Sequence, residues 1–212
     1  MLITRRTAIS TGAAVTLVGI AAPLRALTPT SSQTMGPFYP VDHLPDTDAD
    51  LTRIAGSSGT AKGTPINVIG RVRDMKGNPV ADAKLEIWQA NAGGRYRHPG
   101  DAANPVPIDP NFQGYAVVRT DRSGNFKFRT IKPGAYKIPG GQWRTPHIHL
   151  DVVSRNERIV TQMYFPGEKL NDTDLVLGTA DSKPSVISRA IEPLSGDPGA
   201  LAFAWDIVLL NA

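Results

Sequence analysis

The sequence predicts an all-β fold: an antiparallel β-sandwich with long loops, an extended N-terminal arm and little helix. Three observations lead to this prediction. Short apolar or alternating runs recur along the chain, and turns rich in Gly, Asn and Pro separate them. One connection is far longer than an ordinary hairpin turn. No long segment has a helical period, and we find no internal repeat, dinucleotide fingerprint or phosphate-binding loop.

Seven segments have the composition of strands. In chain order they are PINVIGRVRD (65–74), AKLEIWQAN (83–91), YAVVRTD (115–121), FKFRTI (126–131), HIHLDVVS (147–154), RIVTQMYF (158–165) and LAFAWDIVLL (201–210). They are rich in β-branched and aromatic residues, and most are bounded by turn formers such as KGNP and RSGN. One segment, SKPSVISRAIEPL (182–194), is the candidate for a short helix.

Residues 1–26 have the order of a secretory signal. Arg5 and Arg6 precede an apolar run from about Ala13 to Ala22, and Pro23 and Ala26 follow it. The run is too short for a stable membrane span. The paired arginines indicate the twin-arginine route, so we expect an exported, periplasmic protein; an uncleaved amphipathic N-terminus is the alternative. Residues 27–63, rich in Ser, Thr, Asp, Gly and Pro, form the expected extended arm, and residues 64–212 form one expected β-sandwich domain.

The charge balance excludes a nucleic-acid partner. The whole chain has 23 basic and 19 acidic residues, a net charge of +4. Loss of Arg5, Arg6 and Arg25 with the signal would leave 20 basic against 19 acidic residues, and thus no basic surface. The chain has no cysteine, which excludes thiolate metal sites and cysteine nucleophiles. A site made of oxygen and nitrogen ligands remains open.

The most informative stretch is IKPGAYKIPGGQWRTPHIHL, residues 131–150. Side chains alternate across a strand, so His147 and His149 point to one face and Ile148 to the other. Two imidazoles on one face of a strand can chelate a metal, although they could equally be ordinary strand histidines. The turn sequence before the strand can bring Tyr136 towards the same face.

The long loop NAGGRYRHPGDAANPVPIDPNFQGY follows the second predicted strand and contains Tyr96. Taken alone, Tyr96 could simply pack under the loop with its hydroxyl bonded. The chain has only four histidines and five tyrosines, however, and two of each fall in these Gly/Pro-rich segments. A phenol normally titrates near ~10, so tyrosine ligands require a strongly charged cation, and Fe(III) suits anionic phenolates better than Fe(II) or Zn(II) does.

The motifs together resemble the intradiol ring-cleavage dioxygenase family, and most closely its protocatechuate-cleaving branch. The resemblance runs from about Gln33 to Glu168, through GPFYP, LEIWQANAGGRYRHPGD, PNFQGY, RTDRSGNFKFRTIKPGAY, QWRTPHIHLDV and TQMYFPGE in order. Lys137 and Ile138 depart from the branch, which usually has a proline and a tryptophan there.

The resemblance implies one non-haem Fe(III) ion per chain, with Tyr96, Tyr136, His147 and His149 as ligands. The implied substrates are a catechol-type small molecule and O2, and the implied product is a cis,cis-muconate. Tyr136 would take a substrate proton, and Arg144 would stabilise negative charge on the ring. Gln162 matches a glutamine near the substrate pocket. We expect a homo-oligomer.

Two alternatives remain at this point. In the first, the chain is a non-catalytic exported binding module that has kept the sandwich fold, with Tyr96 and Tyr136 as packing residues. In the second, Zn or Cu binds at His147 and His149. The tyrosines make poor sense in the second alternative, because neither metal favours phenolate ligands.

Overall fold

The computed structural model describes residues 27–42, 46–138 and 140–211. The predicted signal segment therefore lies outside the described residues. The strands are β1 (Pro65–Asp74), β2 (Lys84–Trp88), β3 (Tyr115–Arg119), β4 (Asn125–Ile131), β5 (Tyr136–Lys137), β6 (Trp143–Arg144), β7 (His147–Val153), β8 (Arg158–Tyr164), β9 (Arg189–Ile191), β10 (Leu201–Ala204) and β11 (Ile207–Leu209). The α-helices are α1 (Leu175–Gly178) and α2 (Lys183–Val186), and the 3-10 turns are Pro99–Asp101 and Lys169–Asp172.

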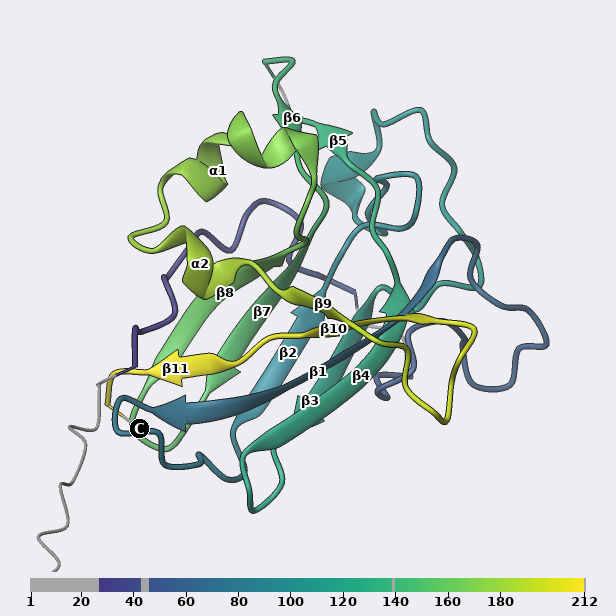
Figure 1. Cartoon of the computed structure of the whole chain (residues 1–212). Coiled ribbons are helices and arrows are strands. Elements are labelled where there is room, and N and C mark those ends of the chain that lie inside the picture. Colours follow the sequence, from purple (N-terminus) through teal and green to yellow (C-terminus); the bar gives the residue numbers. More distant parts are fainter. Residues whose placement is uncertain (1–26, 43–45, 139, 212) are drawn as a thin grey trace, which may run out of the picture.

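Two sheets form the sandwich (Figure 1). One has the order β3-β2-β7-β8 and is antiparallel throughout. In the other, β1 lies between β4 on one side and β10 and β11 on the other, and β9 pairs with β10. The prediction of an all-β sandwich with little helix is confirmed. One detail differs: β1 pairs with β10 and β11 in parallel, because the chain returns to this sheet through a long crossover.

The predicted C-terminal strand 201–210 is interrupted in its middle. β10 and β11 pair with β1 in the same register, but Trp205 and Asp206 leave the ladder between them. There the Arg71 amide donates to the Asp206 side chain at 3.0 Å. A Cβ on Gly70 would lie 1.8 Å from the Trp205 carbonyl oxygen, so only glycine allows this approach.

The inner faces of the two sheets form one hydrophobic core. Its members, fully buried, include Ile66 and Val68 of β1, Leu85 and Ile87 of β2, and Leu150 of β7. Burying such side chains stabilises the fold by roughly 1.5–3 kcal/mol each. Because the core takes the even-numbered residues of β7, the odd-numbered residues must point outwards, and the site is built on that outer face.

The predicted arm packs on its own domain. Its first part bonds to the edge of β8 through the Gln33 amide and the Val160 carbonyl oxygen, at 2.8 Å. Its second part places Leu51, fully buried, in the core. The arm therefore covers the outer face of the β7-β8 pair rather than extending from the domain.

Helical structure is limited to short pieces. The predicted helix over 182–194 is one turn, α2, and the chain then extends into β9. The turn α1 was not predicted. No helix of the described ranges has the length and apolarity to cross a bilayer. In Figure 1, α1 and the β5-β6 pair lie at the same end of the sandwich.

Candidate metal site and its surroundings

The structure brings together the four side chains that the sequence predicts as ligands. His147 and His149 project from the outer face of β7, Tyr136 comes from β5, and Tyr96 comes from the loop after β2. Their exposed fractions are only 2–5 %. Ring centroids lie 4.8 Å apart for the two histidines, 5.6 Å for Tyr136 and His147, and 5.4 Å for the two tyrosines. The four rings therefore face one another in a buried cluster.

The hydrogen bond of His147 fixes its tautomer. Its Nδ1 lies 2.6 Å from the Thr145 carbonyl oxygen, which can only accept, so Nδ1 carries the proton. The lone pair on Nε2 then faces the Tyr136 hydroxyl at 3.4 Å and the His149 Nε2 at 3.2 Å. A carbonyl that orients an imidazole in this way is the usual support of a metal-ligating histidine.

His149 is positioned by packing. Its ring stacks on the indole of Trp88, its register partner on β2, with centroids 4.9 Å apart and planes 8° apart. On the other side, a Cβ on Gly36 of the arm would lie 3.2 Å from His149 Cε1, and Gly36 has φ +71°. The imidazole is thus held between a strand residue and the arm.

Tyr96 is buried with an unpaired hydroxyl. Its backbone amide donates to Asp101 Oδ2 at 2.8 Å, which fixes the loop, but among the described residues its hydroxyl oxygen has no hydrogen-bond partner. A buried polar atom without a partner costs roughly 1–3 kcal/mol, so a native site is expected to supply one. A cation bound among the four rings would do so.

The protein environment keeps both imidazoles neutral. Burial lowers the pKa of His147 and His149 well below the usual value, and the charge of Arg144 adds to the effect. Burial also raises the pKa of Tyr96 and of Tyr136 above the ordinary phenol value. The phenols therefore stay protonated at neutral pH unless a strongly charged cation displaces their protons.

This donor set fits a hard metal ion. Among the described residues no group of three or more His, Cys, Asp or Glu side chains could hold a metal, and the two histidines have two tyrosines as neighbours instead. Two phenol oxygens and two imidazole nitrogens are suitable ligands for a trivalent cation.

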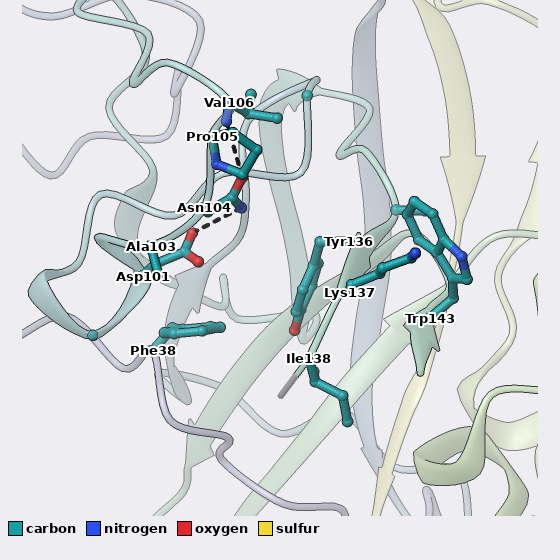
Figure 2. Close-up of a pocket in the computed structure, with 13 residues that line it drawn as sticks. Phe38, Asp101, Ala103, Asn104, Pro105, Val106, Tyr136, Lys137, Ile138 and Trp143 are labelled. Atoms are coloured by element: carbon teal, nitrogen blue, oxygen red, sulfur yellow. Dashed lines mark hydrogen bonds between the residues drawn. The ribbon is translucent and has the colours of Figure 1, made fainter. Parts of the chain in front are cut away.

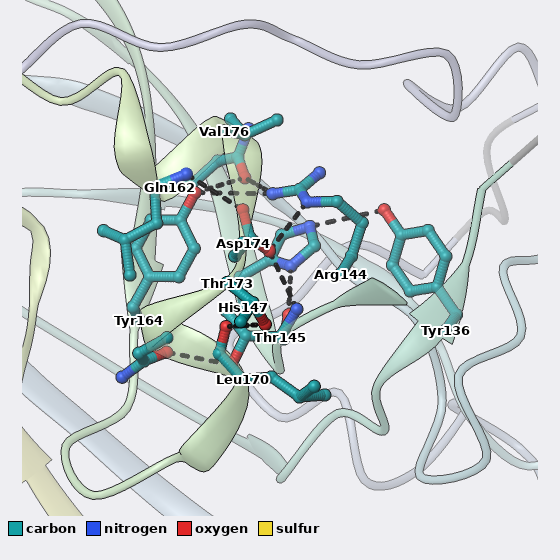
Figure 3. A network of polar contacts seen from close by, with 12 residues as sticks. Tyr136, Arg144, Thr145, His147, Gln162, Tyr164, Leu170, Thr173, Asp174 and Val176 are labelled. Carbon is teal, nitrogen blue, oxygen red and sulfur yellow. Dashed lines mark hydrogen bonds and ion pairs between the residues drawn. The ribbon is translucent and has the colours of Figure 1, made fainter. Parts of the chain in front are cut away.

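Arg144 lies beside this cluster in a buried polar network (Figure 3). Its Nη2 donates to Gln162 Oε1 at 2.6 Å and to the Tyr164 hydroxyl at 3.3 Å, and its Nε donates to Asp174 Oδ2 at 2.9 Å. Gln162 Nε2 donates in turn to the Thr34 carbonyl oxygen at 2.9 Å. Burial acts to lower the Arg144 pKa, but the charges of Tyr136 and Asp174 outweigh it and raise the pKa, so the guanidinium stays charged.

Tyr136 also lines a cavity of about 450 Å³ (Figure 2). Its walls are mostly apolar and include Phe38, Ile138 and Trp143. Lys137 and Asp101 are its charged members. The Asp101 carboxylate accepts hydrogen bonds from the Tyr96 amide and from Asn104 Nδ2. Lys137 Nζ lies 5.2 Å from the centroid of the exposed Trp143 ring. Tyr136 lines the cavity and also contacts His147, whereas the two histidines are not among the lining residues.

Gln162 lies behind Arg144 rather than among the cavity-lining residues. Sequence reasoning missed three neighbours of the site: Trp88, Tyr164 and Asp174. Strand alternation could have found Tyr164, which shares a face of β8 with Gln162. Asp174 had only the weak signal of a polar residue before a helical turn.

The chain is similar in sequence to known dioxygenases. A family model described as "Dioxygenase" matches residues 35–211. The beta chain of protocatechuate 3,4-dioxygenase from Burkholderia cepacia is 42% identical over 82% of this chain and 76% of its own. The 6-chlorohydroxyquinol 1,2-dioxygenase of Cupriavidus pinatubonensis is 35% identical over 58% of this chain and 47% of its own.

A solved structure has the same fold. It is the dioxygenase domain of a dioxygenase carbohydrate-binding protein fusion from Streptomyces sp. SirexAA-E, which superposes with a TM-score of 0.64. It is 28% identical in sequence, and the match covers 87% of this chain and all of that domain. These matches favour an enzyme over the alternative of a binding module. The chain belongs to the intradiol ring-cleavage dioxygenase family.

Proposed function

We propose that the protein uses one non-haem Fe(III) ion per chain and O2 to cleave a catechol-type, protocatechuate-like aromatic between its two hydroxyls. The observation that carries the proposal is the buried cluster of two phenols and two neutral imidazoles, in which the Nε2 atoms of His147 and His149 lie 3.2 Å apart. Tyr96, Tyr136, His147 and His149 would hold the ion. When bound, Fe(III) supplies Lewis-acid polarisation of the catechol oxygens and a template for them.

The reaction balances without a further cofactor. The carbon–carbon bond between the two hydroxyl-bearing carbons breaks, and both atoms of O2 enter the product, a cis,cis-muconate. The ring loses four electrons and O2 gains four, so no external reductant is required.

Tyr136 is the proposed proton acceptor. It borders the cavity and faces His147 with its hydroxyl, so it is the one ligand candidate that a substrate entering the cavity would meet. As a phenolate it can take the proton of one catechol hydroxyl, which is general-base assistance. Its high pKa, caused mainly by burial, favours keeping that proton.

Arg144 is the proposed electrostatic partner. Its guanidinium is charged, buried and fixed on one side by Gln162 and Asp174, so it needs little reorganisation when negative charge develops on the ring. Gln162 would act through Arg144 by holding Nη2.

The substrate is proposed from the cavity. Its apolar walls suit an aromatic ring, and its one lysine offers an ammonium group to an anionic substituent on that ring. Asp101 does not compete with that substituent for the Lys137 ammonium, because its carboxylate is already bonded to the loop. A ring carboxylate, as in protocatechuate, would form an ion pair with the Lys137 ammonium group.

The first test is a visible absorption spectrum with metal analysis of the same sample. A tyrosinate-to-Fe(III) band that shifts when protocatechuate or catechol is added, with ring cleavage in air, would support the proposal. A protein that stays colourless and iron-free after reconstitution, and leaves every catechol intact, would refute it.

We further propose, from the sequence and the relatives, that the protein is exported and assembles as a homo-oligomer. The relative from Burkholderia cepacia is named as one chain of an enzyme, which supports an assembly. All four ligand candidates lie in this one chain, which supports copies of itself as the partners.

A further inference from the structure

The buried carboxylate of Asp174 bonds to Arg144 but has no chemical step of its own in the mechanism above. Asp174 precedes the single turn α1, in the crossover between β8 and β9, thirty residues along the chain from Arg144. Its side chain is fully buried (0 % exposed). A buried carboxylate is costly unless it is paired and hydrogen-bonded, so its partners indicate what it is for.

Asp174 accepts three hydrogen bonds. Oδ1 accepts from the Leu177 amide at 2.9 Å, which caps α1. Oδ2 accepts from Arg144 Nε at 2.9 Å and from the Thr145 amide at 2.8 Å. One oxygen therefore organises the helical turn, and the other holds the strand segment that leads into the two histidines.

These contacts decide how the guanidinium faces the site. With Nε held by Asp174 and Nη2 held by Gln162 and Tyr164, two of its three nitrogens are bound on the side away from Tyr136 (Figure 3). Among the described residues no hydrogen bond involves Nη1. Because the guanidinium is planar, fixing two nitrogens fixes the direction of the third.

We propose that Asp174 is a positioning residue that orients Arg144 so that its free Nη1 serves the reacting ring. The inference rests on the function proposed above, and it assigns to α1 the role of carrying this carboxylate. Asp174 does not line the substrate cavity and has no described hydrogen bond to a ligand candidate. Besides burial, its charge helps to raise the pKa of Tyr136, whereas its effect on the orientation of the site passes through Arg144 and Thr145.

The substitution Asp174→Asn separates this role from a structural one. Asn keeps a side-chain oxygen that can cap α1, since Asn is as good as Asp at this position. It loses the charge, and its amide nitrogen cannot accept from Arg144 Nε. The matched control is Asp197→Asn, because Asp197 accepts from Arg129 Nε at 2.6 Å and so forms the same type of ion pair, with no contact to the site.

We expect Asp174→Asn to lower kcat per bound iron by about 10- to 100-fold, as supporting residues of metal sites do. KM and the anaerobic affinity for protocatechuate should stay within about threefold, because the lost orientation matters only when charge develops in the transition state. In an Arg144→Gln background the same substitution should cause little further loss of kcat, since the effects of residues that act through one another are not additive. The control variant Asp197→Asn should have the same kcat per bound iron as the wild-type protein.

A second readout does not depend on activity. In the metal-free protein, the Arg144 Nε–H proton is buried and bonded, so it should exchange slowly with water in NMR spectra, and Asp174→Asn should abolish that protection. If Asp174→Asn does not fold, Asp174→Glu, which keeps the charge, replaces it in the same measurements and should retain part of the activity and part of the protection.

An unchanged kcat per bound iron in Asp174→Asn would overturn the inference. So would a double variant with Arg144→Gln in which the two losses of kcat are additive. So would loss of iron alone, because that is what a purely structural residue would cause. These outcomes differ from failure of the proposed function, in which the wild-type protein itself would cleave no catechol.

Discussion

The Nδ1 of His147 lies 2.6 Å from the carbonyl oxygen of Thr145, the residue two positions earlier in the chain. This contact fixes the imidazole so that its other nitrogen faces His149 and Tyr136. Arg144, which precedes Thr145, belongs to the polar network behind the site. The short segment from Arg144 to His149 therefore carries both the proposed electrostatic partner and half of the proposed ligands.

Tyr136→Phe should keep most of the iron and slow turnover. The substitution removes one of the four proposed protein ligands and the one of them that borders the cavity. Loss of a general base typically costs about 10²- to 10⁴-fold, so kcat should fall at least 10²-fold. Metal analysis and oxygen uptake on one sample measure both effects. Tyr115→Phe, a buried tyrosine outside the ligand set, is the control; turnover equal to wild type in Tyr136→Phe would contradict the role.

His149→Ala should instead lose iron. The variant removes a nitrogen ligand and leaves the Trp88 face without its stacking partner. Iron content after reconstitution and dialysis is the measurement, and we expect it to fall by about 10-fold or more. Asp151→Asn, two residues along the same face of β7, should keep its iron. A His149→Ala protein with full iron would show that the ligand assignment is wrong.

The metal-free protein should lose stability as the pH falls below 6.5. In the folded state burial lowers the pKa of His147 and His149 well below 6.5, so the unfolded state binds more protons in acid. The free energy of unfolding therefore rises with pH in this window, by up to about 1.4 kcal/mol per pH unit for each histidine. Urea unfolding between pH 7.5 and pH 5.5 measures the slope. His149→Gln should show a smaller slope, and an identical slope would contradict this explanation.

Lys137→Gln should affect anionic substrates selectively. Lys137 is exposed, so its attraction for a ring carboxylate is screened by water and worth at most about 1 kcal/mol. We expect kcat/KM for protocatechuate to fall about two- to fivefold, with catechol unaffected. Steady-state kinetics with both substrates test this. An equal loss for both would mean that Lys137 supports the cavity rather than recognising the substituent.

Replacement of Arg5 and Arg6 by lysine should block export if the twin-arginine prediction is right. The wild-type chain should then appear in the periplasmic fraction without its first residues, and the variant should stay in the cytoplasm at full length. Fractionation followed by mass spectrometry of the N-terminus distinguishes the two. Equal distribution of both proteins would contradict the prediction.

The sequence alone determined the strands of the sandwich and the shared face of the two histidines, because both follow from local rules. Alternation along 147–153 puts both histidines on one face, and the bounds of β1 agree with the predicted strand residue for residue. The resemblance of the ordered motifs to a known family then connected Tyr96 and Tyr136 with these histidines, across a long loop that no local rule could have folded.

Only the tertiary structure decided the partners of those residues. The parallel pairing of β1 with β10 and β11, the contact of Gly36 with His149 and the bond from Arg144 to Asp174 join segments far apart in the chain. Such contacts depend on the path of the crossover and of the arm, which burial and packing of the whole domain determine. A lone aspartate before a four-residue turn has no sequence signal that it will meet an arginine thirty residues earlier.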